Sequence, residues 1–314
     1  METETTNTTT TTTTSSETTE IEAEMENCKL TGFLEDFMFQ VPRGPGGWDM
    51  SEVVYQVRGP TYLKSKKKTP SMAPLFEFVG LQMAQIPDQP KAVKGKKAEP
   101  ASSFKTTHIA TESWSALPRD DLQNEYLIVN YIVPGTPGVQ VVMYFRATEE
   151  ARDAIRHDQE STEKFTSPNG KATETPPLQE GWQSILHQFW QADQTYCDAR
   201  FKVIPCMDKT APWAVKMAVG EKPALVGKKL QQFYFRGPNY FEVDMDIASS
   251  STAARILSLV RSLSTSLIVD VGVTIEATGV TELPERMLCQ CRLWGLDFKN
   301  AVPHPPTEMR SHTC

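Results

Sequence analysis

Three carboxylates recur at every second residue in the last third of the chain. Glu242, Asp244 and Asp246 alternate with apolar residues over positions 240–247, a pattern that predicts a strand with the carboxylates on one face, roughly 6 to 7 Å apart. Such hard oxygen ligands suit magnesium or calcium, which would make the protein a metal-dependent enzyme. We favour a cross-strand charge ladder as the simpler interpretation. Its basic partners would be Arg200, Lys202, Lys216 and Arg236.

Other catalytic patterns are absent from the sequence. A glycine-rich segment at 220–229 resembles a phosphate loop, but six residues separate its glycines where four are needed, and no Ser or Thr follows. The pair Cys289 and Cys291 lacks a second pair at zinc-ligand spacing, so we interpret both as buried apolar residues. We therefore predict no catalytic residues, no metal and no cofactor.

Lysine runs are the candidate sites for an anionic lipid headgroup. Each lysine near an anionic leaflet contributes roughly 1 kcal/mol of attraction, and solvated loops are the competing interpretation. The candidate headgroup residues are Lys64, Lys66, Lys67, Lys68, Lys228, Lys229 and Arg236.

Aromatic residues supply the apolar surface of the second half of the chain. They either close a core or line a cavity for an acyl chain, and the sequence leaves both alternatives open. The residues are Trp182, Phe189, Phe201, Trp213, Phe235 and Phe241.

The composition limits the class of protein. The 314 residues carry a formal net charge of −7, and residues 1–26 alone hold seven Glu, twelve Thr and no Lys or Arg. The remaining chain is electrically balanced, which argues against a nucleic-acid partner. With 39% hydrophobic and 23% charged residues it can bury a core. No run reaches the length of a membrane span and no secretory signal begins the sequence, so we expect a cytoplasmic protein with reduced cysteines.

The elements that must position these residues are mostly strands. We expect a disordered tail over 1–27, a short helix and linker over 28–47, one domain over 48–300 and a flexible tail over 301–314. Expected strands span 53–57, 76–86, 126–133, 139–146, 200–204, 213–219, 231–236, 240–247, 267–276 and 287–298; expected helices follow Thr148 and span 178–193 and about 249–263. The fold class predicted is α+β, a curved, largely antiparallel sheet with a few packed helices around a core or an apolar cavity.

The order of several short segments resembles one known family. They are 57–63, 130–135, 200–205, 212–216, 234–240, 242–247, Ser249-Ser250, 283–285 and Arg292-Leu293. Together, from about residue 48 to 300, they resemble the C-terminal domain of the plant protein Enhanced Disease Resistance 2.

This resemblance implies a regulatory role and no catalytic residue set. In the plant proteins the domain follows a pleckstrin-homology domain and a lipid-binding START domain, and the proteins restrain defence-linked cell death at membranes. Only 47 residues precede the match, so we expect neither extra domain here. Our leading hypothesis is a non-enzymatic module that binds lipid or associates peripherally with an anionic membrane. The alternative is a protein-interaction scaffold with a closed core.

Overall fold

The computed structural model describes residues 41–86, 108–162, 181–220 and 222–303. The expected N-terminal tail and the helix at 30–39 lie outside these residues, as does most of the expected C-terminal tail. Where that tail begins, Ala301 is buried and the Val302 carbonyl accepts a hydrogen bond from the Gln85 amide at 2.7 Å. Position 301 therefore still belongs to the packed domain.

Twelve strands are present in the described part of the chain. They are β1 (Gly47–Asp49), β2 (Gln56–Arg58), β3 (Lys68–Pro70), β4 (Phe76–Gln85), β5 (Tyr126–Val133), β6 (Val139–Ala147), β7 (Phe201–Met207), β8 (Ala224–Leu225), β9 (Gln231–Gly237), β10 (Tyr240–Asp246), β11 (Ile268–Ile275) and β12 (Met287–Trp294). The alternating patterns therefore predicted most of the long strands, with ends shifted by a residue or more.

The α-helices are fewer than the strands in the described part of the chain. The α-helices are α2 (Tyr62–Ser65), α3 (Glu149–Thr162), α4 (Gly181–Gln191), α5 (Gln194–Arg200), α6 (Trp213–Val219) and α7 (Ser251–Leu263), and the 3-10 turns used below are η1 (Ile109–Thr111), η2 (Val226–Lys228) and η3 (Ile247–Ser249). Within the described residues no helix is long and apolar enough to cross a membrane.

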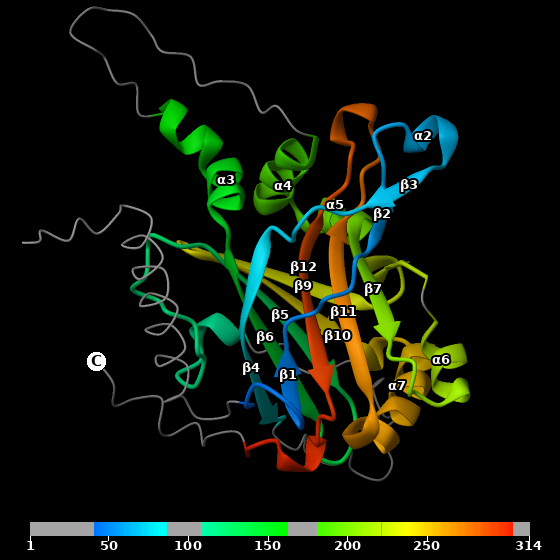
Figure 1. Ribbon diagram of the computed structural model, residues 1–314. Coiled ribbons are helices and arrows are strands. Elements are labelled where there is room, and N and C mark those ends of the chain that lie inside the picture. Colours follow the sequence, from blue (N-terminus) through cyan, green and yellow to red (C-terminus); the bar gives the residue numbers. More distant parts are fainter. Residues whose placement is uncertain (1–40, 87–107, 163–180, 221, 304–314) are drawn as a thin grey trace, which may run out of the picture. The chain divides into compact units, whose positions relative to one another are not determined.

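One large curled sheet organises these elements (Figure 1). Its strand order is β8-β7-β11-β12-β4-β6-β5-β10-β9, with β1 added against β12, while β2 and β3 form a separate ribbon. Every pairing in it is antiparallel except β10 with β5 and β12 with β4. The predicted α+β class with a curved, largely antiparallel sheet is confirmed. The two parallel pairings were not predicted, because they join strands far apart in sequence.

The expected strand at 213–219 is wrong, because this segment is helix α6. Its large apolar residues fall at every second position, which fits a strand, but residues four apart also share one face of a helix. Val215 is buried and Val219 packs beside it, whereas Trp213 is 76% exposed on the other side. Alanine, methionine and lysine within the segment favour the helix, and Pro212 directly before it suits a helix start.

Candidate functional site

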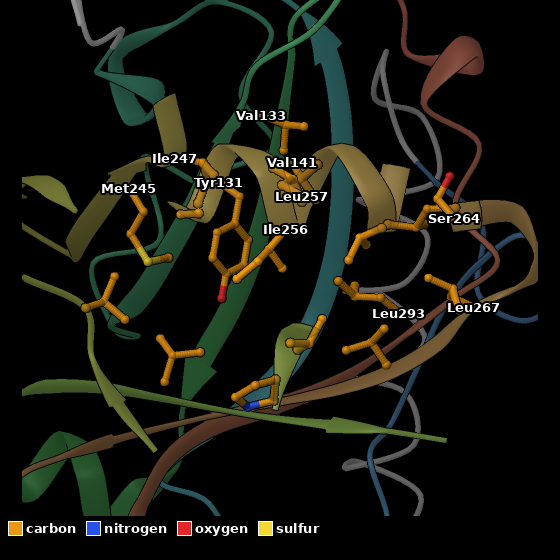
Figure 2. Close-up of a pocket in the computed structure, with 18 of the residues that line it drawn as sticks. Tyr131, Val133, Val141, Met245, Ile247, Ile256, Leu257, Ser264, Leu267 and Leu293 are labelled. Carbon is orange, nitrogen blue, oxygen red and sulfur yellow. The ribbon is translucent and has the colours of Figure 1, made fainter. Parts of the chain in front are cut away.

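An apolar cavity of about 330 Å³ lies between the sheet and helix α7. Two rows of paired residues form its walls. Met245 on β10, Tyr131 on β5 and Val141 on β6 are neighbours in register, and so are Met207 on β7, Val269 on β11 and Leu293 on β12. The sheet curls, so these two rows face a common space. Figure 2 shows that space beneath α7.

Helix α7 forms the remaining side of the cavity. Its stripe of Ala253, Ile256, Leu257 and Val260 lines the space, and none of the helix residues is fully buried. An amphipathic helix in a globular protein normally buries such a stripe in the core. Here the stripe faces a cavity.

Contacts at both ends hold α7 in place. At the start, the Ser250 hydroxyl accepts a hydrogen bond from the Ala253 amide at 3.4 Å and so caps the helix. Near the end, the Arg261 guanidinium donates to the carbonyl oxygens of Pro134 (3.3 Å) and Pro137 (2.6 Å) in the β5–β6 loop. The helix is thus attached at its ends while its middle spans the cavity.

Polar groups are sparse in the cavity wall. Of the residues that line it, only Tyr131 and Ser264 carry polar side-chain atoms. Figure 2 shows the Tyr131 ring extending into the space with its oxygen at the tip. That hydroxyl has no hydrogen-bond partner among the residues described. Burial raises the pKa of Tyr131, so at neutral pH it remains a hydrogen-bond donor.

The six aromatic candidates do not line this cavity. Trp182, Phe189, Phe201 and Phe241 are buried in the core, and Phe189 and Phe241 lie with ring centroids 5.4 Å apart. Phe235 is half-buried and stacks on the His108 ring at 4.4 Å. Trp213 belongs to neither core nor cavity, because it stands on the outer side of α6. The residues that do form the cavity are mostly aliphatic, with Tyr131 and Phe298 as the aromatic members. They come from seven strands, from α6 and α7 and from the turns between elements, and the curl of the sheet brings them together.

A second concavity, of about 640 Å³, is lined by the β2–α2–β3 ribbon on one side and by β8 with η2 on another. It brings together parts of both lysine runs, namely Lys68, Lys228 and Lys229, with Lys222 added. Lys64, Lys66 and Lys67 are exposed but do not line it. We call this concavity the basic cleft.

Arg236 is exposed, but its guanidinium already has partners within the protein. Its guanidinium donates to the Trp190 carbonyl at 2.7 Å and to the Ala192 carbonyl, and it lies over the Phe241 ring at 4.4 Å. These carbonyls belong to the C-terminal end of α4, where a cation is favoured. Arg236 therefore links α4 to β9, and its role in headgroup binding stays a prediction.

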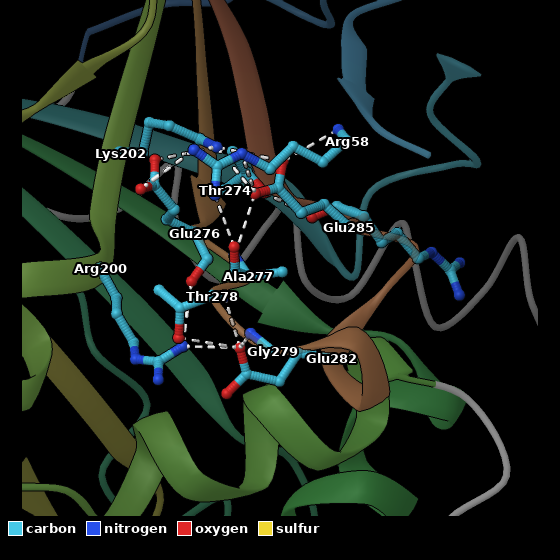
Figure 3. Close-up of polar contacts among 11 residues, drawn as sticks. Arg58, Arg200, Lys202, Thr274, Glu276, Ala277, Thr278, Gly279, Glu282 and Glu285 are labelled. Carbon is cyan, nitrogen blue, oxygen red and sulfur yellow. Dashed lines mark hydrogen bonds and ion pairs between the residues drawn. The ribbon is translucent and has the colours of Figure 1, made fainter. Parts of the chain in front are cut away.

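A network of charged side chains forms the floor of the basic cleft (Figure 3). Lys202 Nζ contacts both oxygens of Glu285 at 2.9 and 3.0 Å, and Glu285 also accepts hydrogen bonds from the amides of Arg58 and Ala277 at 3.0 Å each. Arg58 pairs with Glu276 at 3.1 Å. Two cations and two carboxylates thus neutralise one another.

The three carboxylates of β10 form neither a metal site nor a charge ladder with lysine or arginine. Both faces of this strand are buried, because residues 108–117 cover the side that the alternation left to solvent. Glu242 accepts hydrogen bonds from the amides of Ile109 (2.7 Å) and Ala110 (2.8 Å). Asp246 accepts from the Ala248 amide at 2.9 Å and caps η3. No group of three or more potential ligand residues that could hold a metal occurs in the described ranges.

Asp244 lies between these two carboxylates and is the most isolated of the three. Asn130 on β5 donates to its Oδ1 at 3.1 Å, while Oδ2 has no hydrogen-bond partner in the described structure. Burial and the nearby charge of Glu242 raise the pKa of Asp244 well above its ordinary value, and burial also raises the pKa of Glu242. The pair therefore retains a proton at neutral pH, as a buried structural element.

Of the other basic ladder candidates, Lys202 pairs with Glu285 as described. Arg200 pairs with Glu282 at 3.0 Å. Lys216 lies on α6 and its Nζ donates to the Lys209 carbonyl at 2.7 Å. The expected cross-strand partners are thus used elsewhere, and the charge ladder is wrong.

Comparison with known proteins gives a family match over most of the chain. The model of the family described as "Protein ENHANCED DISEASE RESISTANCE 2, C-terminal" matches residues 48–297. A protein from Arabidopsis thaliana, "Protein ENHANCED DISEASE RESISTANCE 2-like", is 36% identical over 119 residues, which cover 38% of this chain and 16% of that protein's length. The match therefore spans about a sixth of the curated relative. No solved structure matches the chain.

Proposed function

The chain belongs to the Enhanced Disease Resistance 2 C-terminal family, whose membership supports a regulatory domain, and we propose that it acts by binding a lipid. The ligand is an elongated apolar molecule with one hydrogen-bonding group, and it occupies the cavity beneath α7. The protein performs no reaction on this ligand. It is cytoplasmic and meets membranes peripherally when it takes up or releases the lipid.

The observation that carries this proposal is the size and lining of the cavity. An apolar cavity of about 150 Å³ already admits benzene, and this one, at about 330 Å³, is within the usual range for ligand sites. A ligand that fills this space removes the apolar lining from water and therefore stabilises the folded protein.

The lone hydroxyl of Tyr131 supports one polar contact within an otherwise apolar site. A phenol without a partner in an apolar space gains a hydrogen bond when a ligand presents an acceptor such as an ester or ketone oxygen. A single donor positions a ligand but supplies neither a nucleophile with a base nor a set of ligands for a metal. The cavity chemistry therefore favours binding over catalysis.

The alternative, a scaffold with a closed core, fits the cavity less well. A scaffold would use the same aliphatic residues to fill its interior at ordinary packing density. Lipid found in the purified protein by native mass spectrometry would favour the lipid-binding proposal. Its absence, together with failure to bind an apolar dye, would favour the scaffold.

Filling the cavity tests the proposal directly. Ala253→Phe places a phenyl ring in the space from α7, whereas Ser258→Phe places the same ring on the exposed side of the helix. We expect Ala253→Phe to weaken binding of the uncharged dye N-phenyl-1-naphthylamine at least about tenfold and to raise the unfolding free energy by about 1 to 2 kcal/mol. Ser258→Phe should change neither. Equal dye binding by both variants would refute the assignment of the cavity.

A further inference from the structure

The basic cleft has a strongly unbalanced charge at its rim. In the floor of the cleft, the charges of Arg58 and Lys202 are neutralised by ion pairs with Glu276 and Glu285. The remaining cations that line it are Lys68, Lys222, Lys228 and Lys229. Within the part of the chain that the structure describes, none of these four has a carboxylate within ion-pair distance. The open cleft thus presents four uncompensated positive charges.

These four lysines come from two places in the sequence that the fold brings together. Lys68 begins β3 in the small ribbon, whereas Lys222, Lys228 and Lys229 flank the edge strand β8 and turn η2. All four are exposed. Their ammonium groups therefore remain hydrated in the free protein and can turn towards a ligand in the cleft. A concave arrangement concentrates the field of such charges more than a flat surface does.

The type of ligand follows from the donors. Lysine is a compact point charge with three donors, suited to phosphate oxygens, while the planar fork of Arg58 that would suit a carboxylate is already paired with Glu276. Tyr62 also lines the cleft and adds a hydroxyl donor. Four lysines and a volume of about 640 Å³ fit a group with more than one phosphate charge better than a single small ion.

The cleft and the apolar cavity lie on opposite faces of the same sheet edge. Along β7, Lys202 and Ile204 face the cleft, whereas Val203 and Pro205 face the cavity. Ala224 on β8 lines both. At Ala224, the two-residue edge strand β8 and the η2 turn after it separate the cleft from the cavity.

We propose that the basic cleft binds a phosphate-bearing group. The group comes either from the headgroup of a lipid or from a soluble phosphate compound, and the site's chemistry is the same for both. This binding does not require the cavity to be filled, because the two spaces have different linings.

The test measures phosphate binding by the full chain without any apolar ligand. Inorganic tripolyphosphate, titrated by calorimetry, serves as the soluble probe, and vesicles of phosphatidylcholine with phosphatidic acid serve as the lipid probe, with pure phosphatidylcholine for comparison. The double variant Lys68→Gln/Lys228→Gln removes two charges from the cleft. Lys64→Gln/Lys67→Gln removes the same number from exposed lysines outside it.

We expect the cleft variant to lose roughly tenfold in affinity for tripolyphosphate, since each exposed charge pair contributes up to about fivefold, and the control variant to bind as the unchanged protein does. If tripolyphosphate binds, a soluble phosphate compound is sufficient to occupy the cleft. If only phosphatidic acid vesicles bind, and the cleft variant weakens that binding, the ligand is a lipid headgroup. No binding of either probe, or an equal loss in both variants, overturns the proposal. Such a result would leave the lipid-binding proposal for the cavity untouched, because that proposal is tested by dye binding measured on the same samples.

Discussion

Asp244→Asn provides a sharp test of the buried carboxyl pair on β10. The aspartate lies two residues from Glu242 on the same strand, both side chains are fully buried, and only Asn130 donates to Asp244. Burial and the charge of Glu242 raise the pKa of Asp244 above its ordinary value of 3.8. Asparagine has nearly the same shape as the protonated carboxyl, so the substitution should be tolerated at neutral pH.

The pH dependence gives the sign and the size of the effect. Because the folded pKa lies above the unfolded one, the folded protein keeps a proton that the unfolded chain releases as the pH rises above 3.8. Stability contributed by that proton is complete below the unfolded pKa and is lost as the pH rises towards the folded pKa. The loss is about 1.4 kcal/mol per pH unit for each proton within the interval between the unfolded and the folded pKa.

Urea unfolding at pH 5, 6, 7 and 8 measures this difference. The Asn variant lacks the proton in question, so its unfolding free energy should rise relative to that of the unchanged protein by up to about 1.4 kcal/mol per pH unit, as long as folded Asp244 keeps its proton. Asp49→Asn is the matched control, since hydrogen bonds from the Met50 amide and Arg43 lower the pKa of Asp49 and place its titration below pH 5. A constant difference for Asp244→Asn across the series would refute a raised pKa at this position.

Two further substitutions test the attachment of α7 and the charged network in the floor of the basic cleft. Arg261→Met removes the hydrogen bonds to the Pro134 and Pro137 carbonyls. We expect the unfolding free energy in urea to fall by about 2 kcal/mol and the dye to be released faster in stopped-flow measurements. An unchanged release rate would show that this attachment does not restrain α7. Lys202→Met leaves Glu285 buried without its ammonium partner and should cost about 3 kcal/mol, whereas Lys64→Met, at an exposed position, should cost less than about 0.5 kcal/mol. Equal stability of these two lysine variants would contradict the structural role of the network.

The cavity and the basic cleft share elements with different roles. β7 and β8 contribute to the walls of both: Val203 and Pro205 of β7 line the cavity, Lys202 and Ile204 line the cleft, and Ala224 of β8 lines both. A ligand at either site therefore contacts the same short sheet edge.

Local patterns predicted most of the elements but not their partners. The alternation in β10 and the helical stripe of α7 were both readable, since each depends on the spacing of residues along a single segment. The helix at 213–219 could not be recognised in this way. Apolar residues at every second position fit a strand, but the pairs among them that are four apart also share one face of a helix. Helix α5, capped by Asp193 through the Tyr196 amide, was too short to give a periodic signal.

The sequence by itself determined the α+β class, the family, the curl of a largely antiparallel sheet and the existence of lysine runs and a large apolar inventory. Only the tertiary structure decided what these residues face. Glu242 on β10 accepts hydrogen bonds from Ile109 and Ala110, Arg236 is engaged because α4 ends beside it, and Lys68 and Lys228 line one cleft because the small ribbon lies near the sheet edge. Each of these arrangements brings together residues far apart in the chain, and residue spacing carries no information about such distances.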